Sequence, residues 1–185
     1  MERFKYNIVL QCNKLNRIIV SDASTLILLQ KIGLLDKLVK NFKIVISEEI
    51  YKEAVLKGKA RKFSDSYQIE NKINENLVKI VKIKDRNKAI QLVNEFGIGE
   101  GEAQSIVLFS QEKADILAAD DHKSINVCKV YRIPFMTALT FALDSCKRNI
   151  IRKNEAKEMI ESLSIYGRYK DELIYKALSY LEVKK

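Results

Sequence analysis

Apolar and polar positions divide the chain into segments of two kinds. Short β-branched apolar runs are typical of buried strands, and we expect strands at 17–21, 42–47, 77–83, 114–120 and 133–137. Apolar residues that recur every three or four positions are typical of amphipathic helices, and we expect these at 24–33, 34–40, 48–58, 85–97, 102–113 and 121–131. A weaker pattern over 60–76 also favours a helix.

Strands that alternate with helices predict a parallel sheet with helices on both faces. The expected fold class is α/β, a three-layer α/β/α sandwich around a parallel sheet of four to five strands. From Thr137 onward the pattern is helical, with breaks near 149–154 and at Gly167. Because 185 residues can bury one good core, we expect one domain, 17–185, preceded by an N-terminal extension, 1–16. Its helical tail, from about residue 138, should pack on the sandwich.

The composition narrows the class of partner. The chain has 33 Lys and Arg against 24 Asp and Glu, a net charge of +9, which favours anionic partners and above all nucleic acid. No apolar stretch approaches the roughly 20 residues that cross a bilayer, and charges interrupt the N-terminus where a signal peptide would be apolar. We therefore expect no membrane partner and a cytoplasmic location. Three scattered cysteines and one histidine predict no zinc site.

Acidic residues follow two of the expected strands. Asp22 comes directly after the strand at 17–21, and Asp120 and Asp121 come at the end of the strand at 114–120. In an open parallel sheet, functional sites form beyond the carboxyl ends of the strands. Two strands therefore bring carboxylates to the same edge.

Two helices bring further acids. Glu102 falls inside the apolar stripe of its helix, Asp121 shares a stripe with Ile125, and Glu53 borders another. Carboxylates are seldom buried unless they are paired or bound to a cation. No Lys or Arg lies at helical spacing on the inner face beside Glu102 or Asp121. A bound Mg²⁺ or Mn²⁺, which takes oxygen ligands and contacts phosphate, would balance the negative charge of both carboxylates.

Each acid also has a structural interpretation. Asp22, or one of the pair Asp120 and Asp121, can cap the helix that follows it. Glu53 can lie on a solvated face, and Glu102 can be favoured by the helix N-terminus. The convergence of four segments on one edge of the sheet favours the metal site over these separate roles.

The chain closely resembles PIN-domain proteins, in particular a branch of predicted prokaryotic nucleic-acid-binding PIN proteins related to VapC-type toxins. The resemblance runs from about Arg17 to the C-terminus and rests on four motifs in order: "IIVSDASTLILLQKIGLLDKL", "VISEEIYKEAV", "GIGEGEAQSIVLF" and "ADILAADDHKSINVCKVYRIPFMT". The segment "GRYKDELIYKALSYL" is similar to the terminal helix of that branch.

The resemblance implies a Mg²⁺- or Mn²⁺-dependent endoribonuclease, with the first and fourth strands side by side. Its catalytic acids would be Asp22, Glu53, Glu102 and Asp121, and its metal ligands Asp22, Glu102, Asp120 and Asp121. Ser24 corresponds to a hydroxyl residue near the first aspartate and is expected to contact the nucleic acid. Two positions depart from the common pattern: Ala119 replaces a frequent Thr, and Glu102 replaces a frequent Asp.

The resemblance and the positive net charge suggest a nucleic-acid substrate and protein partners. RNA is the expected substrate, with DNA not excluded, and its backbone would be positioned by Lys147, Arg148, Arg152 and Lys153. The family suggests the toxin of a toxin–antitoxin pair, with an antitoxin-like partner and a homodimer. One alternative is a non-catalytic PIN-like module that binds nucleic acid. A receiver-type signalling domain is less favoured, because only one acid follows the first strand and no lysine lies at the last.

Overall fold

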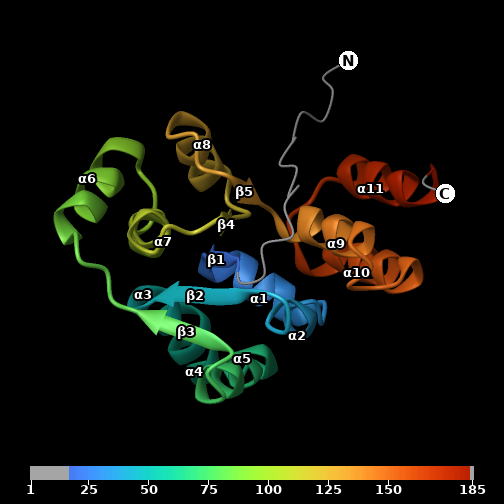
Figure 1. The fold of residues 1–185 in the computed structure, drawn as a ribbon, viewed down its shortest axis with the longest axis horizontal. Coiled ribbons are helices and arrows are strands. Elements are labelled where there is room, and N and C mark those ends of the chain that lie inside the picture. The colour runs from blue at the N-terminus through green and yellow to red at the C-terminus, as the bar shows by residue number, and fades with distance from the viewer. Residues whose placement is uncertain (1–16, 184–185) are drawn as a thin grey trace.

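A five-stranded parallel sheet forms the centre of the protein in a computed structural model that describes residues 17–183 (Figure 1). The strands are β1 (Ile18–Ser21), β2 (Lys43–Ser47), β3 (Val78–Val81), β4 (Ile116–Ala118) and β5 (Phe135–Met136). Their order is β3-β2-β1-β4-β5. The expected parallel sheet, with its first and fourth strands adjacent, is confirmed. The predicted extension, 1–16, lies outside the described residues.

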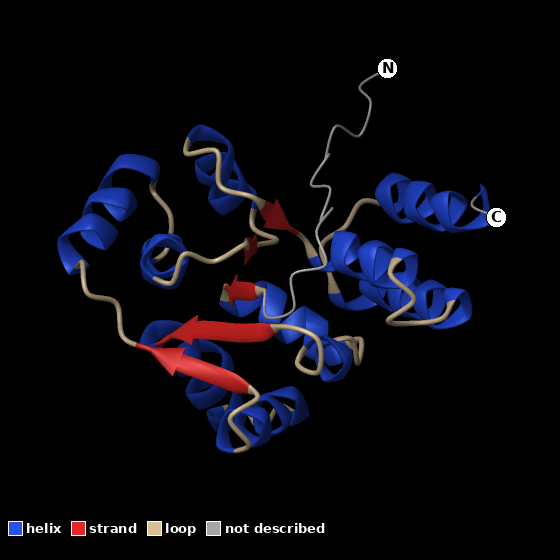
Figure 2. Ribbon diagram, in the orientation of Figure 1, coloured by secondary structure: helices blue, strands red, loops and turns tan. Residues whose placement is uncertain are grey.

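Helices cover both faces of the sheet (Figure 2). One face carries α6 (Arg86–Phe96), α7 (Glu100–Gln111) and α8 (His122–Val130). The other carries α1 (Ala23–Lys31), α2 (Leu35–Leu38), α3 (Glu48–Tyr51), the π-helical η1 (Lys52–Leu56), α4 (Lys57–Ala60), α5 (Ser64–Asn74), α9 (Ala138–Lys147), α10 (Lys153–Tyr166) and α11 (Asp171–Val183). The predicted three-layer sandwich is therefore confirmed.

Successive strand residues enter opposite cores, as the two-residue period of a strand requires. In β1, Ile19 packs in the core under α1 and α9, whereas Val20 packs in the core under α7 and α8. Leu117 and Ala118 divide in the same way in β4. Because both faces are buried, these strands read as continuous apolar runs in the sequence.

The expected elements differ from the observed ones mainly at their ends. The strand expected at 77–83 is ordered as Val78–Val81, an edge strand whose Lys79 and Ile80 are exposed. The weakly patterned segment 60–76 divides at 61–63, where Lys62 has a φ of 59°, before α5 begins at Ser64. The helix expected at 48–58 contains the π-helical segment η1.

The C-terminal helices share the core of one sheet face. Leu163 of α10 and Ile174 and Leu181 of α11 are buried together with residues of α1 and α9. The expected packing of this tail on the sandwich is thus observed, and the chain leaves helical structure between α9 and α10 and again at Gly167. No helix within residues 17–183 is long and apolar enough to span a bilayer.

Candidate metal centre

Asp22 lies where β1 ends and α1 begins. Its Oδ1 accepts a hydrogen bond from the backbone N–H of Thr25 at 2.7 Å and another from the hydroxyl of the exposed Ser24 at 3.1 Å. Its own backbone N–H donates to the carbonyl of Ala118 at 3.0 Å, which ties this residue to β4. Asp22 is therefore the N-cap of α1, and the position of its carboxylate is set by two adjacent strands.

The second carboxylate oxygen of Asp22 has no partner. Oδ2 is buried and accepts no hydrogen bond from any described residue, and the whole residue is only 2% exposed. Burial raises the pKa of Asp22 to about 7, and the nearby charge of Asp120 adds to the shift, although hydrogen bonds from Thr25 and Ser24 oppose it. A buried anionic oxygen without a partner is costly, and a cation bound beside it would remove that cost.

Asp120 is held by two segments from the C-terminal part of the chain. Its Oδ2 accepts from the backbone N–H of Ala138, the first residue of α9, at 2.9 Å, and its Oδ1 accepts from the hydroxyl of Tyr169. The same Tyr169 oxygen accepts from the backbone N–H of Leu139 at 3.3 Å. Burial raises the pKa of the Asp120 carboxyl and of the Tyr169 hydroxyl, so the aspartate lies in a poorly solvated place.

Asp121 caps α8. Its Oδ2 accepts from the backbone N–H groups of Lys123 at 2.7 Å and Ser124 at 3.2 Å. Capping was the structural alternative for Asp22 and for one of the two later aspartates, and both Asp22 and Asp121 do it. Capping uses one oxygen of each carboxylate, Oδ1 of Asp22 and Oδ2 of Asp121.

Glu102 lies in the first turn of α7, where its Oε2 accepts from the backbone N–H of Gly99 at 2.8 Å. Partial burial raises its pKa, and the charges of Asp121 and Glu53 raise it further. Lys123 lowers it, and the ammonium of that lysine donates to the carbonyl of Gly97 at 3.0 Å. Helical spacing could not identify Lys123 as a counter-charge, because it reaches Glu102 from a different helix.

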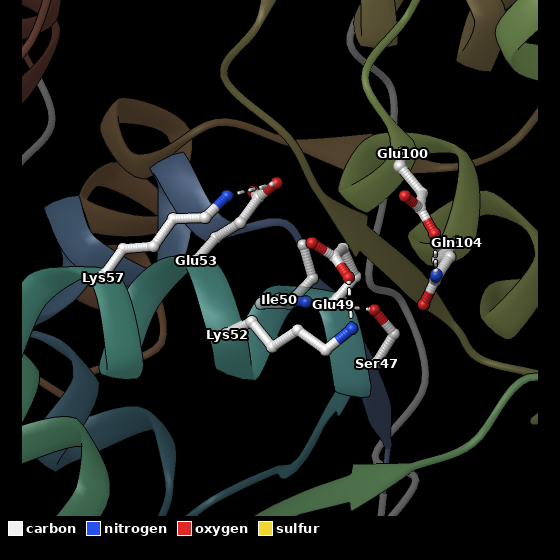
Figure 3. A network of polar contacts seen from close by, with 8 residues as sticks. All are labelled: Ser47, Glu49, Ile50, Lys52, Glu53, Lys57, Glu100 and Gln104. Carbon is white, nitrogen blue, oxygen red and sulfur yellow. Dashed lines mark hydrogen bonds and ion pairs between the residues drawn. The ribbon is translucent and has the colours of Figure 1, made fainter.

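Glu53 lies in η1 and points towards α7 (Figure 3). A β-carbon at Gly101 of α7 would lie 2.9 Å from Oε2 of Glu53 and 3.0 Å from Ile50, so glycine permits this close approach. The side chain is half-buried, which raises its pKa, while Lys57 at 3.9 Å lowers it. Glu53 is thus more buried than the solvated-face interpretation allowed.

Two further acids widen the acidic region beyond the predicted residues. Glu49 and Glu100 both raise the pKa of Glu53, and each has a polar partner on its own helix, Lys52 at 2.8 Å and Gln104 at 3.1 Å (Figure 3). Glu49 and Glu53 are four residues apart on one helical face, a spacing that could have indicated the first of them.

The five predicted acids all lie at the carboxyl edge of the sheet; we call them the acid cluster, namely Asp22, Glu53, Glu102, Asp120 and Asp121. Among residues 17–183, no three Asp, Glu, His or Cys side chains converge closely enough to enclose a metal ion. Mg²⁺, however, keeps several waters and is often bound through one or two carboxylates and substrate phosphates. The oxygen donors and the unpartnered Oδ2 of Asp22 fit such an ion.

The four predicted RNA-binding cations lie away from the acid cluster. Helix α9 begins at Ala138, which contacts Asp120, and its ten residues span about 15 Å and end at Lys147. Arg148 pairs with Asp144 at 2.6 Å, and Lys153 pairs with Glu182 at 2.9 Å. Lys147, Arg148, Arg152 and Lys153 therefore surround the turn between α9 and α10, at the end of α9 remote from Asp120.

The hydrogen bond between Tyr169 and Asp120 was not predicted from the sequence. Tyr169 lies 49 residues from Asp120 in the chain, in a segment expected only to continue into a helix. Local periodicity carries no information about a hydrogen bond over this separation.

The fold is that of a PIN domain. The family model described as DUF3368: PIN domain matches residues 18–182, and the chain belongs to this family. Among solved structures, the chain is similar to the crystal structure of PAE2754 from Pyrobaculum aerophilum, with 16% sequence identity and a TM-score of 0.49 over 68% of this chain and 93% of that one. No curated protein matches the sequence.

Proposed function

We propose that the protein is a Mg²⁺- or Mn²⁺-dependent endoribonuclease that acts at the acid cluster. The observation that supports this most strongly is Asp22, whose buried Oδ2 lacks a partner while burial raises the pKa of its carboxyl to about 7. Membership of the PIN-domain family supports nucleic acid as the substrate. RNA is the proposed substrate, and DNA stays an outcome of the test.

The proposed role of each acid depends on its position in the cluster. Asp22, Glu102 and Asp121 would hold the metal ion, and Asp120 would assist. Bound there, the ion would activate a water molecule and neutralise the charge that develops on the phosphate. Glu53 would complete the cluster directly or through a water, and the exposed Ser24 hydroxyl, bonded to Asp22 at 3.1 Å, would face the substrate backbone.

Three further roles extend this proposal. The cations Lys147, Arg148, Arg152 and Lys153 would contact an RNA long enough to reach the turn between α9 and α10. A role as the toxin of a toxin–antitoxin pair, with an antitoxin-like partner, stays a prediction from the family. So do a homodimer and a cytoplasmic location.

The decisive experiment is cleavage of a mixed, structured RNA pool by the purified protein in Mn²⁺, in Mg²⁺ and in chelator. Asp22→Asn and Asp121→Asn are compared with Glu75→Gln, which removes an exposed acid where α5 leads into β3, at the opposite edge of the sheet. We expect cleavage that requires metal, is lost in both aspartate variants and is retained in Glu75→Gln.

Two outcomes would contradict the proposal. Cleavage that survives both aspartate substitutions would indicate a contaminating nuclease. RNA binding without cleavage by any sample would favour the alternative, a PIN-like module that binds nucleic acid. The same assay with a single-stranded DNA pool decides between the two substrates.

A further inference from the structure

A hydrogen bond from Tyr169 joins the segment between α10 and α11 to Asp120 of the acid cluster. Tyr169 donates its hydroxyl hydrogen to Asp120 and accepts from the backbone of Leu139. A β-carbon at Gly167 would lie 2.7 Å from the Tyr169 ring and 2.8 Å from the carbonyl oxygen of Leu163, so the ring packs tightly against the end of α10. We call residues 166–170 the Tyr169 loop.

Two positively charged residues flank Tyr169 in the chain. Arg168 and Lys170 are its immediate neighbours, each about 3.8 Å away along the backbone, and both side chains are exposed. No ion pair is found for either among the described residues. The acids that follow, Asp171 and Glu172, lie in the first turn of α11. Glu172 pairs with Lys176, which lowers the pKa of Glu172, and the charge of Lys170 also lowers it.

Two exposed aromatic rings, Tyr166 and Phe63, lie close to Lys31, and Tyr166 is the first residue of the Tyr169 loop. The ammonium of Lys31, in the last turn of α1, lies 5.3 Å from the ring centre of Tyr166 and 5.9 Å from that of Phe63. Tyr166 is 52% exposed and Phe63 is 47% exposed. Tyr166 is three residues from Tyr169, at most about 11 Å of chain. The two rings and Lys31 therefore lie at the α10 end of the Tyr169 loop, and α1 separates them from Asp22 by about 13 Å, the span of two to three nucleotides.

We propose that the Tyr169 loop binds the substrate and holds a single strand of RNA beside the acid cluster. Arg168 and Lys170 would bind phosphates next to the reacting one, and the rings of Tyr166 and Phe63 would stack bases. This inference rests on the proposed function for its substrate, because it names where that substrate is held.

The combination of charges and rings favours a single strand over a duplex. Cations along a path bind backbone phosphates, and exposed rings stack unpaired bases, whose faces a duplex hides. The loop is also closer to the acids than the four cations at the turn between α9 and α10, which the length of α9 separates from Asp120. Phosphates near the reacting bond therefore meet Arg168 and Lys170 first.

The test measures RNA binding separately from cleavage. A short fluorescent single-stranded RNA of mixed sequence is titrated with Asp22→Asn protein, and with Asp22→Asn carrying Arg168→Gln and Lys170→Gln. The matched control carries Lys129→Gln and Arg132→Gln, which remove one exposed Lys and one exposed Arg at the far end of α8, in the other helical layer. A duplex of the same sequence serves as competitor.

Losing two phosphate contacts should weaken binding about 25-fold at 0.1 M salt and lower the slope of log affinity against log salt by about 1.4. The control should change affinity less than twofold, and the duplex should compete poorly. Equal affinity of the loop variant and the control would overturn the loop proposal even if the wild-type protein cleaves RNA. A weaker loop variant alongside a wild-type protein that never cleaves would instead uphold the loop and reject the nuclease.

Discussion

The acid cluster has two parts that differ in how their charge is balanced. We call Asp22 and Asp120 the inner pair and Glu53, Glu102 and Asp121 the outer group. The inner pair is held by backbone N–H groups, Ser24 and Tyr169, and neither residue forms an ion pair with a described Lys or Arg. In the outer group, Lys57 lowers the pKa of Glu53 and Lys123 lowers that of Glu102.

This difference indicates that a cation is needed at the inner pair. Hydrogen bonds to uncharged donors fix the geometry of Asp22 and Asp120 but leave their charges uncompensated, so burial raises the pKa of both carboxyls. The outer glutamates already have lysines nearby. An ion supplied from solution should therefore balance mainly the charge of the inner pair, while Glu102 and Asp121 supply further oxygen ligands and Glu53 completes the cluster.

The largest expected effect is on activity. Asp22→Asn should reduce the metal-dependent rate about 10³-fold, because it removes a charge worth several kcal/mol to a bound ion, whereas Glu53→Gln should reduce it about tenfold. The asparagine keeps an oxygen that can cap α1 through Thr25, so the fold should be preserved. Initial rates on the RNA pool in Mn²⁺ give the two ratios. Equal losses would show that the two parts of the cluster do not differ.

The next effect is on stability in chelator. The pKa of Asp22 is about 7 in the folded protein against an ordinary 3.8, so its contribution to stability is fully present below about pH 4 and is lost as the pH rises through 7. Asp22→Asn removes this loss and should stabilise the metal-free protein by up to about 4 kcal/mol above pH 7, equivalent to roughly 10 °C in Tm.

Thermal unfolding followed from pH 5 to pH 8 measures the size and direction of that change. At pH 5 Asp22 has lost less than half of this contribution, so the difference in Tm between the variant and the wild-type protein should be roughly 40% of that at pH 8. Adding Mn²⁺ should raise the Tm of the wild-type protein and leave that of Asp22→Asn unchanged. An Asp22→Asn protein that is less stable than the wild-type protein at pH 8 in chelator would show that the buried charge of Asp22 does not destabilise the metal-free fold.

Sequence reasoning reached the fold and the edge on which the acids gather because both depend on local signals. The strand periodicity around Ile19 and Leu117 identifies two buried faces, and chain order then places Asp22 and Asp121 at the carboxyl edge. The contacts it missed join residues far apart. Tyr169 reaches Asp120, and Lys123 reaches Glu102 from another helix, so neither interaction follows from the spacing of residues along a helix or a strand.

The smallest expected effect tests the outer group. Lys57 is exposed and lies 3.9 Å from Glu53, and such pairs contribute less than about 1 kcal/mol. Lys57→Gln should therefore change the free energy of unfolding by under about 0.5 kcal/mol. It should lower the Mn²⁺ concentration for half-maximal activity by about threefold at most, since one competing positive charge is removed. Lys59 lies on α4 with Lys57 and pairs with Glu70 of α5 at 2.6 Å, and a matched Lys59→Gln change should leave that concentration unchanged. A tenfold or larger shift for Lys57→Gln alone would place Glu53 among the residues that bind the ion directly, and the distinction between the inner pair and the outer group would then fail at this residue.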